Sequence, residues 1–247
     1  MRPVQRGASP QTTDFARYQD AKPVLVERLG PYCSYCERRL PTTLAVEHIQ
    51  PKGLPQYQGL KGRWENFLLA CANCNANKKN KDVVPAEVLL PDRDNTFAAI
   101  AYLENGTVDV ARCVPINQRG LVSKLLSLLE WNRHISSPLT MSANDKLTAT
   151  ELVNQRMEVW GVAIHAKNTL NGKRTDTSKF RVVITNLALY SGFFSIWMAV
   201  FHQDIDMRKR LIDAFHGTRG SACFDANTTQ PVSPAPNPDR LEDGAKF

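Results

Sequence analysis

The sequence lacks several features that would indicate common functions. Its 13 glycines form no Gly-rich phosphate-binding loop, so we do not expect this chain itself to hydrolyse ATP. Residues 1–13 are polar and contain no apolar signal core, so a secretory leader is not expected either. No internal repeat is present. The 247 residues can therefore form one large domain, or a small domain and a larger one.

Charged residues are absent from residues 182–201, and this run is about as long as the roughly 20 residues of a membrane span. Polar side chains interrupt it, among them Thr185 and Asn186. The pair Ser191-Gly192 predicts that one helix ends there and another begins. We therefore expect two helices buried within the protein and no membrane helix.

The excess of basic residues lies entirely in the first third of the chain. Residues 1–81 contain 13 Lys and Arg but 6 Asp and Glu, whereas residues 82–247 contain 18 of each kind. The formal net charge of +7 therefore belongs to the first of these regions. Binding to phosphates requires such a basic region, although a solvated basic surface would have the same composition.

Four of the six cysteines form two Cys-x-x-Cys pairs, Cys33/Cys36 and Cys71/Cys74. Thiolates at i and i+3 on a tight turn can bind one ion, and two such pairs complete a tetrahedral structural zinc site. Four free thiols are a weaker alternative, because free cysteines do not usually fall into two such pairs. Disulfides are weaker without a secretory signal, and a redox pair is weaker without a βαβ pattern around the cysteines. With Cys113 and Cys223 isolated, a reducing cytoplasm fits best.

The residues between the two pairs have the composition of a charged site. Residues 37–40, a turn at 41–43 and residues 44–49 predict a short hairpin that places Glu47 and His48 at its end. After Cys71 the spacing predicts a helix on which Cys74 faces zinc while Asn75, with Lys78 near it, faces an adjoining cleft. Such a set suits a divalent metal with oxygen ligands beside a general base.

These motifs together resemble the HNH endonucleases. The similarity covers about a fifth of the chain, in the order Cys-x-x-Cys, Glu-His-Ile-x-Pro-Lys and Trp-x-Asn-Phe-Leu-Leu-Ala-Cys-x-x-Cys-Asn-x-x-Lys. It implies a treble-clef-like ββα-metal core braced by zinc. It also implies that His48 is the base that activates water and that Glu47 and Asn75 bind a catalytic Mg²⁺ or Mn²⁺. Asn66 would pin the long loop so that the His is aimed.

A narrower resemblance extends over more of the chain. It is carried by Tyr-Cys-x-Tyr-Cys-Glu at the first Cys pair, Leu89-Leu90-Pro91 followed by Asp, Leu129-x-Trp-Asn-Arg133, and Phe215-x-Gly-Thr. These motifs are similar to those of HNH proteins in bacterial retron and Septu-type antiphage systems. The similarity implies a nuclease that works beside an ATPase subunit.

The remaining segments predict further helices, a hairpin and a tail. Residues 14–29 predict a helix or two broken at Pro23, and Asn105-Gly106 predicts a hairpin between strands at 97–103 and 107–110. Helices are expected near 121–129 and over 144–168, with a basic turn at 171–174. The Pro-rich residues 225–247 cannot form a core, so they predict a disordered tail or an extended arm on the surface.

We therefore expect an α+β protein that hydrolyses DNA phosphodiester bonds. It should consist of a zinc-braced nuclease domain at 1–85, a mainly helical domain at 86–224 and the tail. Five basic residues are candidates for phosphate contacts: Lys52, Arg63, Lys78, Lys79 and Lys81. Two alternatives remain. One is a non-catalytic zinc module that binds nucleic acid, and the other is a protein-interaction subunit whose zinc core is a relic.

Overall fold

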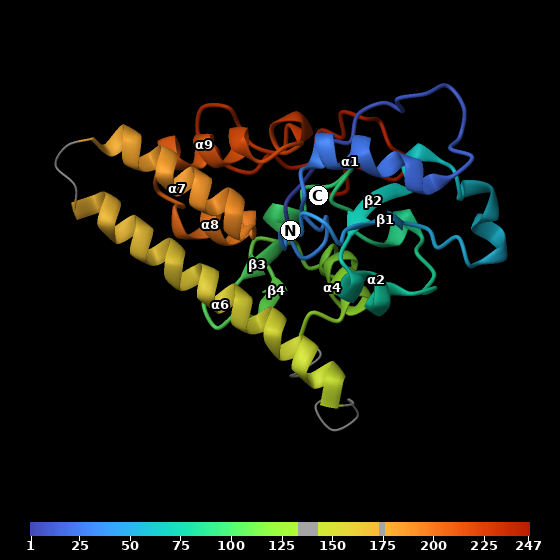
Figure 1. Ribbon diagram of the computed structural model, residues 1–247, viewed down its shortest axis with the longest axis horizontal. Coiled ribbons are helices and arrows are strands. Elements are labelled where there is room, and N and C mark those ends of the chain that lie inside the picture. Colours follow the sequence, from blue (N-terminus) through green and yellow to red (C-terminus); the bar gives the residue numbers. More distant parts are fainter. Residues whose placement is uncertain (133–142, 173–175) are drawn as a thin grey trace.

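Two small sheets and a set of long helices make up the structure, which is a computed structural model describing residues 1–132, 143–172 and 176–247. In Figure 1 strands β1 and β2 and helix α2 lie on one side of the molecule, and helices α6 and α7 form an arm on the other. Both ends of the chain lie near the centre of the molecule (Figure 1). They are held next to each other, because the carbonyl of Met1 accepts from the side chain of Thr96 and the carbonyl of Phe247 accepts from the backbone of Asn95.

The first sheet forms the ββα part of the fold. Strands β1 (Ala45–His48) and β2 (Phe67–Ala70) pair antiparallel, with Glu47 opposite Leu68 and His48 opposite Phe67. Helix α2 (Ala72–Lys78) follows β2 after Cys71. The predicted hairpin between residues 37–40 and 44–49 is wrong, since β1 pairs with β2 instead. The backbone at residues 37–38 is occupied by bonds to residues 192–193 from far along the chain.

The segments around this sheet are short helices and a loop. Pro23 lies in the first turn of α1, where it starts the helix, and Gly30 ends α1 with φ of 75°. The long loop between β1 and β2 contains two 3₁₀ helices. The short helices are η1 (Tyr18–Ala21), α1 (Lys22–Leu29), η2 (Pro55–Leu60) and η3 (Trp64–Asn66).

The second sheet is the hairpin predicted at Asn105-Gly106. Strand β3 (Ile100–Tyr102) pairs with β4 (Val108–Val110), and Gly106 in the turn has φ of 77°. The residues expected to begin the first strand form helix α3 (Thr96–Ala99) instead, because the side chain of Asn95 caps it by accepting from the backbone of Ala98. The 3₁₀ helix η4 (Pro85–Glu87) precedes the hairpin, and helix α4 (Arg119–Leu129) follows it.

The rest of the described chain is mainly helical. The charge-free run forms two helices that meet at Gly192, as predicted. Only the second of them is buried, because the first exposes Val182, Val183 and Tyr190. None of the described helices is long and apolar enough to cross a membrane. Lys173 and Arg174 of the predicted basic turn lie outside the described residues. The elements are α6 (Ala143–Gly172), α7 (Thr177–Ser191), α8 (Phe194–Val200), α9 (Ile205–Ala214) and η5 (Arg219–Ser221).

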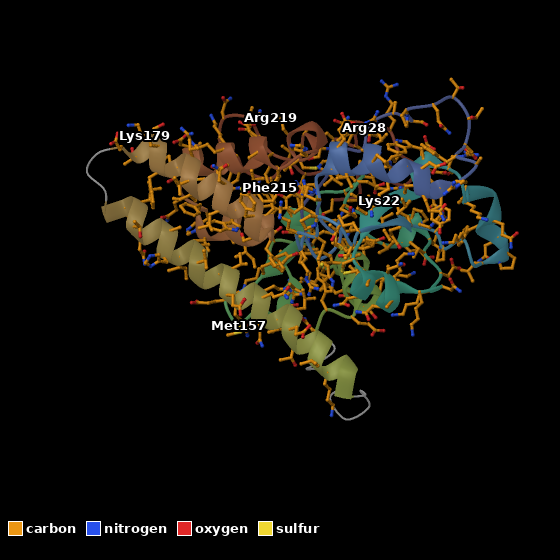
Figure 2. The ribbon with its side chains drawn as sticks, in the orientation of Figure 1. Lys22, Arg28, Met157, Lys179, Phe215 and Arg219 are labelled. Atoms are coloured by element: carbon orange, nitrogen blue, oxygen red, sulfur yellow. The ribbon has the colours of Figure 1, made fainter. Side chains whose placement is uncertain are left out.

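The buried side chains of the described residues form one continuous core. It includes Leu69 on β2, Leu125 on α4 and Trp197 on α8, so the predicted division near residue 85 does not separate two cores. Figure 2 shows the side chains densest where the helical arm meets the ββα part, near Phe215. The ββα part and the helical part therefore stabilise each other by shared packing.

Residues 225–247 are not the disordered tail expected from their prolines. The carbonyl of Phe247 accepts from the backbone N–H groups of Asn95 (2.9 Å) and Ala235 (3.1 Å), and the side chains of Ala235 and Phe247 are buried. The segment cannot build a core of its own, but it can lie on one that the rest of the chain provides. It forms an extended arm, which was the second possibility.

Candidate functional site

Four thiols gather where the loop after α1 meets the start of α2. All four are buried, and their sulfur atoms lie within 4.8 Å of one another, with 3.7 Å between Cys36 Sγ and Cys71 Sγ. Sulfurs at about 2.3 Å from a central zinc would be about 3.8 Å apart, so the residues present fit a tetrahedral zinc site. The structure thus brings together the predicted ligands Cys33, Cys36, Cys71 and Cys74.

The surroundings of these thiols favour a bound cation. Burial raises the pKa of Cys33, whereas hydrogen bonds from Cys33 and the other thiols lower that of Cys71. Four buried thiols cannot all ionise without a positive charge among them. The backbone N–H of Cys74 also donates to Cys71 Sγ at 3.4 Å, which orients one ligand at the start of α2.

His48 ends β1 in a buried position. Its Nε2 lies 3.0 Å from the carbonyl oxygen of Lys61. A carbonyl oxygen only accepts, so Nε2 carries the ring proton and Nδ1 has the available lone pair. The rings of Tyr18 and Phe67 pack against the imidazole edge to face, at centroid distances of 4.7 and 5.2 Å. Burial lowers the pKa of His48 to about 4, so the ring is neutral at pH 7.

Asn66 joins the long loop to the start of β2. Its Oδ1 accepts from the backbone N–H of Gln50 at 2.8 Å, and its Nδ2 donates to the carbonyls of Gln50 (3.0 Å) and Leu60 (3.4 Å). The side chain therefore contacts the loop at its start and at the end of η2. The imidazole of His48 is bound to the carbonyl of Lys61. Asn66 binds the carbonyl of the preceding residue, Leu60, and so helps to hold the Lys61 carbonyl in place.

Glu47 and Lys78 form a buried ion pair. The ammonium of Lys78 lies 2.9 Å from Glu47 Oε1 and donates to the carbonyl of His48 at 2.7 Å. Burial raises the pKa of Glu47, and Lys78 opposes this rise. The placement corrects the prediction that Lys78 contacts phosphate, because its side chain is only 2% exposed and lies between β1 and α2. Tyr35 also donates to Oε1, at 3.4 Å.

Asn75 is exposed on α2, one turn before Lys78. Residues three apart lie about 60° apart around a helix, so the exposed Asn75 borders the buried face of α2 that carries Lys78. The ion pair with Lys78 uses Oε1 of Glu47, and Oε2 is the carboxylate oxygen that could bind a cation. One carboxylate and one amide oxygen fit a hard divalent metal such as Mg²⁺ or Mn²⁺, with water completing its ligands.

The other predicted phosphate contacts are exposed or half-buried, namely Lys52, Arg63, Lys79 and Lys81. Two of them have acidic partners: Arg63 Nε lies 3.0 Å from Asp14 Oδ1, and Lys81 Nζ lies 2.6 Å from Glu130 Oε1. These pairs are partly exposed, so their energies are small and a phosphate could compete for the cations. Lys79 is exposed just after α2.

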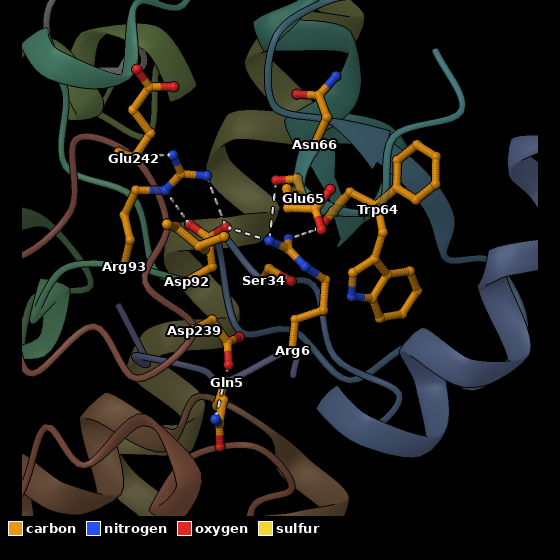
Figure 3. A network of polar contacts seen from close by, with 12 residues as sticks. Gln5, Arg6, Ser34, Trp64, Glu65, Asn66, Asp92, Arg93, Asp239 and Glu242 are labelled. Carbon is orange, nitrogen blue, oxygen red and sulfur yellow. Dashed lines mark hydrogen bonds and ion pairs between the residues drawn. The ribbon is translucent and has the colours of Figure 1, made fainter. Parts of the chain in front are cut away.

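A buried network behind the site was not predicted from the sequence. Figure 3 shows Arg6 reaching the carbonyl of Glu65 and the carboxylate of Asp92, both at 3.1 Å, and it also donates to the carbonyl of Phe67. Arg93 pairs with Asp92 at 3.1 Å. The network holds the N-terminal segment against β2. The sequence could not predict the role of Arg6, because its partners belong to two segments far from it along the chain.

Two motifs of the narrower resemblance, at the first cysteine pair and at Phe215, lie near each other. The rings of Tyr32 and Phe215 are 5.1 Å apart, and Thr218 accepts a bond from Arg2 at 2.9 Å. The carboxylate of Glu37 accepts from the backbone N–H of Ser195 at 2.8 Å. These residues join the first cysteine pair to the C-terminal helices. Arg133 of the same motifs lies outside the described residues.

The comparisons with known proteins agree with the ββα geometry. Residues 33–81 match the HNH endonuclease family. The match contains all four cysteines, both strands of the first sheet and α2, so this part of the predicted resemblance is confirmed and supports a nuclease. No curated protein matches the chain. The narrower resemblance to antiphage systems stays a prediction.

Proposed function

We propose that the chain is a metal-dependent endonuclease that hydrolyses DNA phosphodiester bonds. The observation that carries the proposal is the imidazole of His48, whose Nε2 is bound to the Lys61 carbonyl while Nδ1 keeps its lone pair. The ring lies in the region that matches an endonuclease family, and His48 directly follows Glu47 on β1. A neutral imidazole held in one tautomer is suited to accept a proton from water.

His48 acts as the general base in this proposal. Nδ1 takes a proton from water as the water oxygen attacks phosphorus, in line with the bond to the leaving oxygen. The Lys61 carbonyl remains the acceptor for Nε2–H and so favours the imidazolium that forms. A phosphate anion near the ring would raise the low pKa of His48, because opposite charge stabilises the protonated form.

Glu47 and Asn75 would hold the catalytic Mg²⁺ or Mn²⁺ through oxygen atoms. When bound, such a metal supplies Lewis-acid stabilisation of charge on the scissile phosphate and the leaving oxygen. Lys78 favours the ionised form of the buried carboxylate of Glu47 and holds it in place, because the ammonium lies 2.9 Å from it. Zinc in the four-cysteine cluster would be structural, since four protein ligands leave no open position.

The remaining site residues bind and position the substrate. Asn66 fixes the loop that carries the Lys61 carbonyl, and so aims His48. Lys52, Arg63, Lys79 and Lys81 contact phosphates of the duplex without reading its sequence. The positive charge of residues 1–81 supports this assignment, as does the exposure of these side chains.

In the cell we propose a role as the nuclease effector of a bacterial antiphage system, in the cytoplasm and beside an ATPase subunit. The support is the resemblance of the motifs outside residues 33–81, together with the lack of a phosphate-binding loop in this chain. The helical region is the expected binding site for the ATPase. Co-purification with an ATPase encoded beside the gene tests this role, and a chain that ignores such an ATPase would contradict it.

The main alternative is a zinc module that binds nucleic acid without cutting it. It explains the four cysteines and the basic charge equally well. It gives no reason for a buried histidine with one nitrogen bound to a carbonyl next to a paired carboxylate. A protein-interaction subunit with a relic core is the second alternative, and it would tolerate the loss of His48.

Plasmid nicking by the purified protein distinguishes these functions. We expect cleavage that needs Mg²⁺ or Mn²⁺ and stops when a chelator removes it, while the more tightly bound zinc remains. Asn75→Ala should weaken binding of the catalytic metal, so raising the metal concentration should recover part of its activity. Binding of the plasmid without nicking, both alone and with the ATPase, would favour the non-catalytic module.

A further inference from the structure

Tyr18 packs against His48 of the candidate site, although no motif in the sequence includes Tyr18. It begins η1, which packs on β1, and it precedes the region that matches the endonuclease family. Its side chain is half-buried. It contacts two residues that the proposed function uses, His48 and Lys52.

The first contact holds the imidazole. The ring centroids of Tyr18 and His48 are 4.7 Å apart with an angle of 74° between the planes. Phe67 makes a similar contact at 5.2 Å and 87°. Two aromatic rings and the Lys61 carbonyl thus fix the orientation of His48. Without Tyr18 the imidazole would gain other rotamers, and a displacement of about 1 Å at a reacting group can cost about 100-fold in rate.

The second contact holds a cation at the edge of the site. Lys52 Nζ lies 4.4 Å from the centroid of the Tyr18 ring and 3.2 Å from its hydroxyl oxygen. Lys52 is otherwise exposed, and a free lysine side chain loses up to about 2 kcal/mol of rotamer entropy when it is fixed. The ring face and the hydroxyl of Tyr18 already restrict this ammonium, close to the imidazole.

We propose that Tyr18 is a positioning residue of the nuclease centre, which aims His48 through its ring and holds Lys52 for a substrate phosphate through its ring face and hydroxyl. The inference rests on the proposed function. It adds a residue from outside the family-matching region that couples the proposed base to a phosphate-binding cation. The ring takes part in both roles, whereas the hydroxyl contacts only Lys52, so Tyr18→Phe tests the second role separately.

The first experiment measures kcat and KM of the full chain on duplex DNA. Tyr18→Phe keeps the ring but loses the hydroxyl, so we expect kcat within about twofold of wild type and a raised KM. Tyr18→Leu loses both contacts, so kcat should fall by about 10- to 100-fold. Tyr190→Leu on α7 is the matched control, because it removes a ring that lies 4.9 Å from the guanidinium of Arg39 and is not in the centre. Wild-type kcat and KM in Tyr18→Leu would overturn the inference.

The second experiment needs no cleavage, so it also applies to a variant that folds but is inactive. In the His48→Ala background, the affinity for a short DNA duplex is measured with Tyr18→Phe, Lys52→Met and both changes together. Lys52→Met should lower the slope of log affinity against log salt by about 0.9, as expected for one lost phosphate contact. Tyr18→Phe should weaken binding when Lys52 is present and have no effect when it is absent.

A control and two contrasting results complete the test. Lys179→Met removes an exposed charge at the far end of the helical arm and should leave the affinity unchanged (Figure 2). Equal effects of Tyr18→Phe with and without Lys52 would overturn the role of the hydroxyl. Failure of wild type to cleave under any metal would contradict the nuclease proposal, while the affinity measurements would still decide whether Tyr18 acts through Lys52.

Discussion

Residues 33–81 and residues 143–214 are held together by different interactions. In the first region the strands have four residues each and α2 has seven, whereas α6 alone has 30 residues and α7 has 15. The short elements surround four thiols and a buried ion pair. The long helices bury apolar residues such as Ala163, Ile184 and Leu211.

This difference predicts where single substitutions should change stability most. Elements of four to seven residues have few hydrogen bonds of their own, so their order depends strongly on the polar and metal-ligand interactions around them. The helical region distributes its stability over many side chains, and each contributes less. A function that needs fixed geometry therefore resides in the region with the fewest and strongest interactions.

The largest effect is expected from losing a zinc ligand. Cys74→Ser should lose zinc, and since apparent zinc-binding energies of structural sites are about 10 kcal/mol, residues 33–81 should unfold. Elemental analysis and thermal unfolding measure both effects. Cys113→Ser is the control, because Cys113 is exposed and outside the cluster. Well-folded wild-type protein that contains no zinc would show that the site is not structural.

A smaller effect is expected from breaking the buried ion pair. Lys78→Met leaves the carboxylate of Glu47 buried without its cation, which should cost about 3–5 kcal/mol of unfolding free energy. Lys79→Met, at the exposed neighbouring position, should change it by less than about 0.5 kcal/mol. Denaturant unfolding of the two variants measures the difference. Equal stability of the two would mean that the pair is not formed.

The cost of Lys78→Met should also depend on pH. Burial raises the pKa of Glu47, and removing Lys78 removes the main influence that opposes this rise. A raised pKa means that the folded state gains stability when the carboxyl is protonated and loses it as pH rises through the folded pKa. The variant should therefore be closer to wild type at pH 4 than at pH 7.

The smallest effect on stability is expected on the exposed face of α7. Val183 is 57% exposed, so Val183→Glu should change the unfolding free energy by less than about 0.5 kcal/mol. If the proposed ATPase binds the helical region, the same change should weaken co-purification. Ile116→Glu, at an exposed apolar position on a loop, is the control. Unchanged co-purification in Val183→Glu would place the interface elsewhere.

The sequence predicted those parts of the site whose chemistry requires a fixed spacing. The four cysteines are paired at i and i+3, the spacing at which one turn can offer two ligands to one ion, and the structure clusters them. The helix break at Gly192 and the hairpin at Gly106 were also predictable, because both glycines have positive φ. These features depend on residues close together in the sequence, so the sequence alone is enough to predict them.

Other parts depend on contacts between distant segments and could not be predicted. β1 and β2 pair across a long loop, and Lys78 is buried because its side chain reaches Glu47 and the carbonyl of His48 on β1. The arm at 225–247 is ordered by a core that it does not itself contain. Arg6 and Tyr18 precede the residues that match the family, so only the folded chain places them near the site.

The cleavage rate of His48→Ala, with zinc content and DNA affinity measured on the same sample, tests the central claim most directly. The substitution removes the proposed base but no zinc ligand, so cleavage should fall by about 10² to 10⁴. Zinc content and DNA affinity should stay at wild-type values, because they depend on other residues. Cleavage at the wild-type rate with zinc intact and contaminating nuclease excluded would contradict the assignment of His48 as the base.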